Sequence, residues 1–116
     1  MQQLRWSVVY IYLDPVVGRE QAGNRPAIVV SDEAFNEAME VVTILPITSR
    51  KPGRRIYPNE VLLPAAASGL PGESVVMAHQ IRTVSKSRIK RTVHRLASKH
   101  LREACLEAIC IHLGMY

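Results

Sequence analysis

Four side chains in this sequence have the types and spacing needed for chemistry on a phosphate group. Arg25, directly before Pro26, offers a planar fork of fixed donors that can hold phosphate oxygens, but its high pKa makes it a poor base. Thr48 can donate its hydroxyl to a phosphate oxygen. Glu20 can orient Arg25 or accept a proton, and His79 can act as an acid or a base near neutral pH.

Each of these residues also has a purely structural interpretation. Arg25 can be an ordinary surface arginine, and Glu20 can form a surface ion pair. Thr48 and its neighbour Ser49, which can substitute for it, can satisfy backbone groups in a turn. His79 can be a structural histidine. The residue types alone do not decide between the two interpretations.

The cations are concentrated in two stretches of the chain. The sequence has 15 Lys and Arg against 10 Asp and Glu, a formal net charge of +5. Eight of the cations lie between Arg82 and Arg102 with no acid among them, and four lie in the second stretch: Arg50, Lys51, Arg54 and Arg55. Such surfaces attract polyanions such as nucleic acid or an acidic protein segment. The alternative is a solvated basic face without a partner.

Other chemical classes have little support in the sequence. No His, Asp and Glu residues cluster with metal-ligand spacing, so we expect no metal and no other cofactor. Cys105 and Cys110 fall on different faces of one expected helix, which argues against a disulfide and for a reducing cytoplasm. No apolar run is long enough to span a membrane. We therefore expect a cytoplasmic protein with no membrane partner.

The elements that must position these residues are mostly strands. Alternation, β-branched content and Gly/Pro turns predict a single domain, residues 1–116, with short strands at 7–13, 26–31, 40–46, 59–63, 74–78, 81–84 and within 87–97. Asp32 is expected to cap a short helical turn through Asn36. Ser98 and Gly114 are expected to bound a helix over 99–113. Such a chain forms a small antiparallel barrel or sandwich, and Thr48 falls in the loop after the third strand.

Three segments together resemble the signature of the MazF/PemK toxins. They are 14–26 (DPVVGREQAGNRP), 46–49 (PITS) and 69–88 (GLPGESVVMAHQIRTVSKSR). The start of the chain departs from the family, which has Gly and an acid where this sequence has Trp6 and Ser7. The resemblance implies a mainly β fold, an SH3-like small antiparallel barrel of the MazF/CcdB type with a C-terminal helix.

The resemblance also implies an activity and its residues. Such toxins are homodimers that cleave single-stranded mRNA at short preferred sequences, and a labile antitoxin with an acidic or amphipathic tail silences them. The ribose 2′-hydroxyl attacks the phosphorus, so no metal is required. The family match assigns catalytic roles to Arg25, Thr48 and Glu20. It also assigns one to His79, which stands where some relatives have an acid. The expected RNA-binding residues are Ser49, Arg50, Lys51, Arg54, Arg55, Gln80 and Arg82.

Two other functions remain open from the sequence. One is a non-catalytic barrel that only holds nucleic acid. The other is a toxin of the CcdB type that poisons DNA gyrase. Variants of Arg25 and Thr48 separate the first from a nuclease, because a binding module has no cleavage to lose. DNA damage with intact mRNA would indicate the second.

Overall fold

The computed structural model describes residues 3–13 and 23–116. The elements follow one another as β1 (Ser7–Tyr12), β2 (Asn24–Val29), α1 (Glu33–Ala38), β3 (Val41–Ser49), β4 (Glu60–Leu63), α2 (Ala65–Ser68), β5 (Ser74–Met77), η1 (Ala78–Gln80), β6 (Arg82–Ser85), η2 (Lys86–Arg88), β7 (Ile89–Arg95) and α3 (Lys99–Leu113). This agrees with the expected run of short strands closed by a helix. The Asp14 to Ala22 part of the first loop, which includes Glu20, lies outside the described residues.

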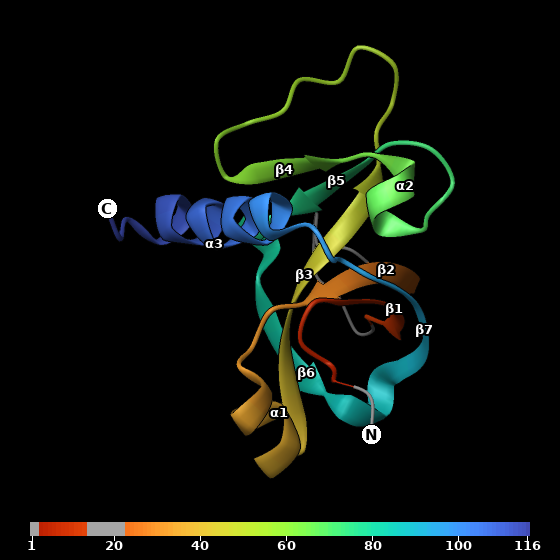
Figure 1. Ribbon diagram of the computed structural model, residues 1–116, viewed down its shortest axis with the longest axis vertical. Helices are drawn as coiled ribbons and strands as arrows, with labels where there is room; N and C mark the ends of the chain where they lie inside the picture. The colour runs from red at the N-terminus through yellow and green to blue at the C-terminus, as the bar shows by residue number, and fades with distance from the viewer. Residues whose placement is uncertain (1–2, 14–22) are drawn as a thin grey trace.

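The strands form an antiparallel sheet in the order β4-β5-β3-β2-β1-β7, with β6 paired to the first half of β3 (Figure 1). The prediction of a mainly β, antiparallel fold with a C-terminal helix is confirmed. The sheet is not closed, because the order of the described strands ends at β4 on one side and at β7 on the other. The two ends of the curved sheet are therefore edge strands rather than barrel neighbours.

The long strand β3 belongs to both halves of the sheet, and the prediction that it ends at Pro46 was wrong. Pro46 is the last residue of β3 that lies opposite β2, where it faces Ala27, and Ile47 already faces Val76 of β5. A proline lacks an N–H and is tolerated where strand pairing is interrupted or exchanged. The strand continues through this exchange, which places Thr48 on a strand rather than in a loop.

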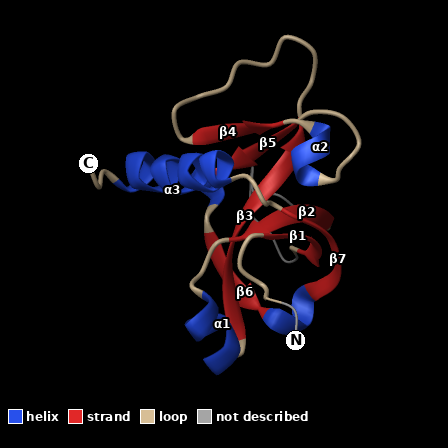
Figure 2. Ribbon diagram, in the orientation of Figure 1, coloured by secondary structure: helices blue, strands red, loops and turns tan. Residues whose placement is uncertain are grey.

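Two apolar clusters hold the sheet, one on each face. The first includes Val8, Ile28 and Leu45 together with Cys105 and Ala108 of α3, so the C-terminal helix covers this face. The second lies on the opposite face and includes Val9, Ile11, Ala27, Val29, Val42, Ile44 and Val84. Successive strand residues contribute to opposite clusters, as the period of two in a strand requires. Figure 2 shows α3 running alongside β4.

The helix boundaries follow the capping signals in the sequence. Asp32 accepts a hydrogen bond from the Ala34 amide, and Ser98 accepts one from the Leu101 amide. Gly114 ends α3 in the left-handed conformation, with φ of 71°. The short helix α2 lies in the connection between β4 and β5. None of the helices in the described parts of the chain is long and apolar enough to cross a membrane.

Candidate active site

Arg25 and Thr48 line the same cleft, which has a volume of about 430 Å³. The cleft lies where β3 passes from β2 to β5, so β2 supplies Arg25 and the end of β3 supplies Thr48. Among the residues that the structure describes, the cleft is lined by Tyr10, Asn24, Arg25, Pro26, Ile47, Thr48, Ser49, Lys51, Leu70, Pro71 and Ser74. The strand exchange thus brings together two residues that are far apart in sequence.

The sheet register fixes the backbones of these residues. Arg25 lies opposite Ile11 of β1, and Pro26 lies opposite Tyr10. Thr48 lies opposite Val75, and Ser49 lies opposite Ser74 of β5. Pairing with β3 begins only at Ala27, so the missing N–H of Pro26 leaves no gap in that ladder. The Arg25 side chain is exposed and that of Thr48 is half-buried. A ligand entering from solvent can therefore reach both.

Of the four cations that follow β3, Lys51 lines the cleft. The guanidinium groups of Arg50 and Arg54 are bonded to oxygens of the protein. Arg50 donates from Nε and Nη2 to the Arg54 carbonyl, at 3.2 and 3.1 Å, and from Nη1 to Glu73. Arg55 is exposed, and its guanidinium carbon lies 5.5 Å from the centre of the Tyr57 ring. Lys51 of this loop and Ser49 at the end of β3 therefore line the cleft, whereas Arg50 and Arg54 stabilise the shape of the loop.

The ion pair between Arg54 and Glu60 holds this loop to the sheet. Arg54 Nη1 and Nη2 donate to the two carboxylate oxygens of Glu60 at 3.0 and 2.7 Å, and the Glu60 side chain is 2% exposed. Burial alone would raise the pKa of Glu60, but hydrogen bonds from Arg54 and the Tyr57 amide lower that pKa below its ordinary value. The hydrogen bonds between Arg54 and Glu60 also raise the pKa of Arg54. Both groups are therefore charged at neutral pH.

The second part of the predicted site lies at the other end of β5. That strand runs from Ser74, in the cleft, to Met77, and His79 follows on η1. The His79 ring lies 6.4 Å from the ring of His112 on α3, at an interplanar angle of 63°. Gln80 donates to the sulfur of Met77 at 3.9 Å. His79 and Gln80 are not among the residues that line the cleft, and neither is Arg82, which opens β6 opposite Ile44.

Several residues of the cleft were not singled out from the sequence. Tyr10 is one, since only its alternation within β1 indicated that it shares a face with Val8. Leu70 and Pro71 follow α2, whose position could not be read from local sequence. Glu60 was also missed as the anchor of the cationic loop. An acid at the start of a strand, just after a basic loop, was the available signal for that role.

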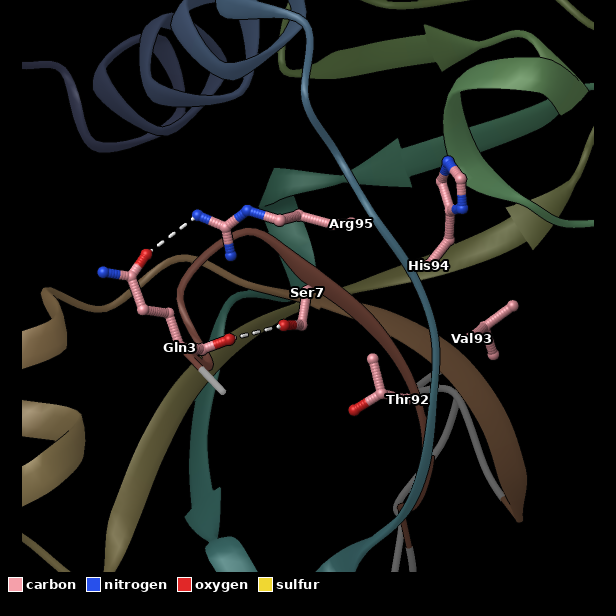
Figure 3. A pocket seen from close by; sticks show the side chains of 6 residues that line it. All are labelled: Gln3, Ser7, Thr92, Val93, His94 and Arg95. Atoms are coloured by element: carbon pink, nitrogen blue, oxygen red, sulfur yellow. Dashed lines mark hydrogen bonds between the residues drawn. The ribbon is translucent and has the colours of Figure 1, made fainter. Parts of the chain in front are cut away.

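A larger hollow of about 760 Å³ lies between the start of β1 and the end of β7 (Figure 3). Its cation, Arg95, donates to the side-chain oxygen of Gln3 and to the Arg5 carbonyl, both at 3.0 Å. Ser7 donates to the Gln3 carbonyl. The polar groups of this hollow are bonded to one another, and neither Arg25 nor Thr48 lines it. The smaller cleft is therefore the better candidate for chemistry on a phosphate group.

Comparison with known proteins identifies the family. Residues 4–113 match the model of the PemK-like, MazF-like toxin of type II toxin-antitoxin systems. The chain is 32% identical to endoribonuclease MazF9 of Mycobacterium tuberculosis, covering 97% of both chains. It is 33% identical to endoribonuclease MazF of Staphylococcus saprophyticus, covering 97% of this chain and 92% of that one.

A solved structure agrees with the fold. The crystal structure of MazF from Deinococcus radiodurans matches with a TM-score of 0.79 and 32% identity, covering 96% of each chain. These comparisons do not favour a non-catalytic barrel or a gyrase poison. The chain therefore belongs to the family of PemK-like, MazF-like toxins of type II toxin-antitoxin systems, in which its curated relatives are endoribonucleases.

Proposed function

We propose that this toxin cleaves single-stranded mRNA at short preferred sequences, without a metal ion, and thereby slows translation. The observation that carries the proposal is the cleft shared by Arg25 and Thr48, with Lys51 beside them, in a chain whose curated relatives are endoribonucleases. A guanidinium, an ammonium and hydroxyl groups are the donors that a phosphodiester needs as negative charge builds on its oxygens.

In the proposed reaction the ribose 2′-hydroxyl is the nucleophile. Its oxygen forms a bond to the adjacent phosphorus as the bond from phosphorus to the 5′-oxygen breaks, which leaves a 2′,3′-cyclic phosphate and a 5′-hydroxyl. Arg25 stabilises the charge on the phosphate oxygens and donates a proton to the leaving 5′-oxygen, and the proton that the base takes from the 2′-hydroxyl balances this transfer. Thr48 donates a hydrogen bond to the same phosphate. The proton of the attacking hydroxyl passes to a base, for which Glu20 and His79 are the two candidates.

The base can be identified by comparing variants of those two residues. Glu20 lies five residues before Arg25 in the sequence, whereas His79 packs beside His112 at the far end of β5. We therefore favour Glu20. Glu20→Gln should lower kcat and remove the acidic limb of the pH–rate profile, while His79→Gln should leave that limb in place. Loss of the limb in His79→Gln would assign the base to His79 instead.

Purified protein incubated with a long single-stranded transcript in EDTA should produce fragments that end in cyclic phosphate. Arg25→Ala should lower kcat by about 10²- to 10³-fold, because one preorganised donor to the developing charge is lost. Thr48→Ala should lower it by about tenfold or more, and Thr48→Ser should retain most of the activity. Intact RNA at ample wild-type protein, or full cleavage by Arg25→Ala, would contradict the proposal.

We also propose that an antitoxin with an acidic tail binds this toxin and that the toxin is a homodimer. Two solved MazE-MazF complexes from Deinococcus radiodurans are similar to this chain, at 30% and 27% identity. The acid-free run from Arg82 to Arg102 suits a negatively charged segment. Co-expression with the neighbouring open reading frame should restore growth, and sedimentation should give twice the mass of the chain. Continued toxicity would count against the antitoxin, and a monomer at micromolar concentration would count against the homodimer.

A further inference from the structure

Tyr10 of β1 and Arg91 of β7 form a pair at the rim of the cleft. The two residues lie directly opposite each other in the register of the strands, and the Arg91 guanidinium carbon lies 4.6 Å from the centre of the Tyr10 ring. Tyr10 lines the cleft and is half-buried, whereas Arg91 is exposed on the edge strand. The Tyr10 ring therefore touches both the cleft and a cation at the surface.

The charge of Arg91 is not neutralised by the described part of the protein. Ion pairs are present at Arg5, Arg50 and Arg54, but no carboxylate in residues 3–13 and 23–116 lies within ion-pair distance of Arg91. The nearest acids along the chain are also distant, since none occurs between Arg82 and Arg102. A guanidinium positioned by an aromatic ring keeps its donors available for an anion.

The loop between β3 and β4, which also borders the cleft through Lys51, offers fewer available guanidinium groups. There the Arg50 guanidinium is bonded to the Arg54 carbonyl and to Glu73, and the Arg54 guanidinium is bonded to Glu60. Arg55 of this loop is exposed and also lies beside a ring, but that ring, Tyr57, does not line the cleft, whereas Tyr10 does. A chain of phosphates that leaves the cleft across Tyr10 therefore meets an arginine that no described carboxylate occupies. The exit toward β7 is therefore the more favourable one.

We propose that Tyr10 and Arg91 form a second subsite of the cleft, which holds the phosphate of a nucleotide flanking the cleaved bond. Arg91 donates to that phosphate, and the Tyr10 ring fixes the guanidinium and packs against the sugar or base. The inference rests on the proposed function and deepens it, because it states where the RNA runs outside the reacting centre. It requires that RNA extending beyond the cleavage site on one side binds more tightly than RNA that ends at the site.

The test uses the cleavage sequence first mapped on a long transcript with the full-length wild-type protein. Short RNAs are then made that end at the mapped site on either the 5′ or the 3′ side, beside RNAs extended by a few nucleotides on that side. Affinities are measured by fluorescence anisotropy with 2′-O-methyl versions that cannot be cut. The variants are Arg91→Ala, Tyr10→Leu and the conservative Tyr10→Phe, which keeps the ring.

Lys99→Ala is the matched control, since it removes one positive charge from a side chain that is 90% exposed on α3. The wild type should gain about tenfold in affinity from extension on one side, and Arg91→Ala and Tyr10→Leu should lose that gain. The slope of log affinity against log salt should become shallower by about 0.7 in Arg91→Ala and stay unchanged in Lys99→Ala. In Arg91→Ala, kcat and the affinity for RNA that ends at the site should remain close to wild type. Tyr10→Phe should keep the gain in affinity from extension.

An equal gain from extension in Arg91→Ala and the wild type would overturn the subsite, and so would an equal loss in Lys99→Ala. These outcomes are distinct from failure of the proposed function, which would appear as uncut transcript with the wild type itself. Thermal unfolding followed by circular dichroism identifies a variant that lost affinity by unfolding. Arg91→Ala provides the decisive result because this exposed side chain carries no part of the core.

Discussion

At the scale of single residues, Trp6 has a backbone conformation that its type rarely adopts. Its φ is 68°, the only positive value among the described residues other than glycine. Its side chain is buried, with the guanidinium carbons of Arg5 and Arg102 at 5.1 and 5.7 Å from the ring centre. Resemblance placed a glycine of the family at this position, and a glycine adopts this φ without strain. Burial of the indole offsets the strain here.

This balance predicts an unusual order of stability for substitutions of Trp6. Trp6→Ala should lower the free energy of unfolding by about 3 to 5 kcal/mol, because it removes the buried ring and keeps a Cβ at positive φ. Trp6→Gly loses the same ring but relieves the backbone, so its loss should be smaller by up to about 1 kcal/mol. Urea unfolding followed by circular dichroism measures both. A glycine variant less stable than the alanine variant would mean that the backbone is not strained.

At the scale of elements, the loop between β3 and β4 depends on one carboxylate. Glu60 opens β4 and binds Arg54, which in turn supplies the carbonyl that Arg50 holds. Lys51 lies within the same loop and lines the cleft. The shape of the loop, and with it the position of a cation in the site, therefore follows from a buried ion pair that makes no contact with the cleft itself.

Glu60→Gln should test this dependence through stability, pH and kinetics. Leaving Arg54 without its partner should cost about 3 kcal/mol of unfolding free energy at neutral pH, and KM should rise more than kcat falls.

The pKa of Glu60 is lowered in the folded protein. The contribution of Glu60 to stability is therefore fully present above its ordinary pKa of 4.5, and it is lost as the pH falls through the folded value. The stability difference between wild type and variant should therefore shrink below about pH 4.5. Glu33, whose pKa is also lowered, is common to both proteins and cancels. A difference that does not change with pH would show that the pair is unimportant.

At the scale of the whole molecule, local patterns predicted the elements better than their connections. Alternation identified β1, β4 and β5, and the caps Ser98 and Gly114 located α3. The error at β3 has a non-local cause, because whether a strand continues past Pro46 depends on β5, which is distant in the sequence. Whether the sheet closes likewise depends on whether the two edge strands, β4 and β7, pair with each other, and these strands are distant in the sequence.

The sequence likewise predicted which residues belong to the site better than it predicted their contacts. Arg25, Thr48, Ser49 and Lys51 were expected to act together, and they line one cleft. Arg50 and Arg54 could not be separated from Lys51 by sequence, since all lie in one basic stretch and only the fold shows which guanidinium groups face carboxylates or carbonyls. His79 was placed with the site by family resemblance, but the length of β5 carries it to the other end of that strand. The role of Glu20 stays a prediction, because that residue is outside the described ranges.

The distribution of charge leads to a final prediction about the whole protein. Twelve of the 15 cations lie in the two basic stretches, and two of these twelve, Lys51 and Arg91, join Arg25 on the proposed RNA path. Arg25 and Lys51 line the cleft and Arg91 stands at its rim, while Arg50, Arg54, Arg95 and Arg102 donate to oxygens of the protein. Each phosphate neutralised on a single strand contributes about −0.7 to the slope of log affinity against log salt. Three contacts therefore predict a slope of about −2 for one chain with non-cleavable RNA, measured between about 50 and 200 mM salt. Use of all twelve clustered cations would give about −8 instead, and such a steep slope would mean that RNA spreads over the basic surface rather than following the path from the cleft to β7.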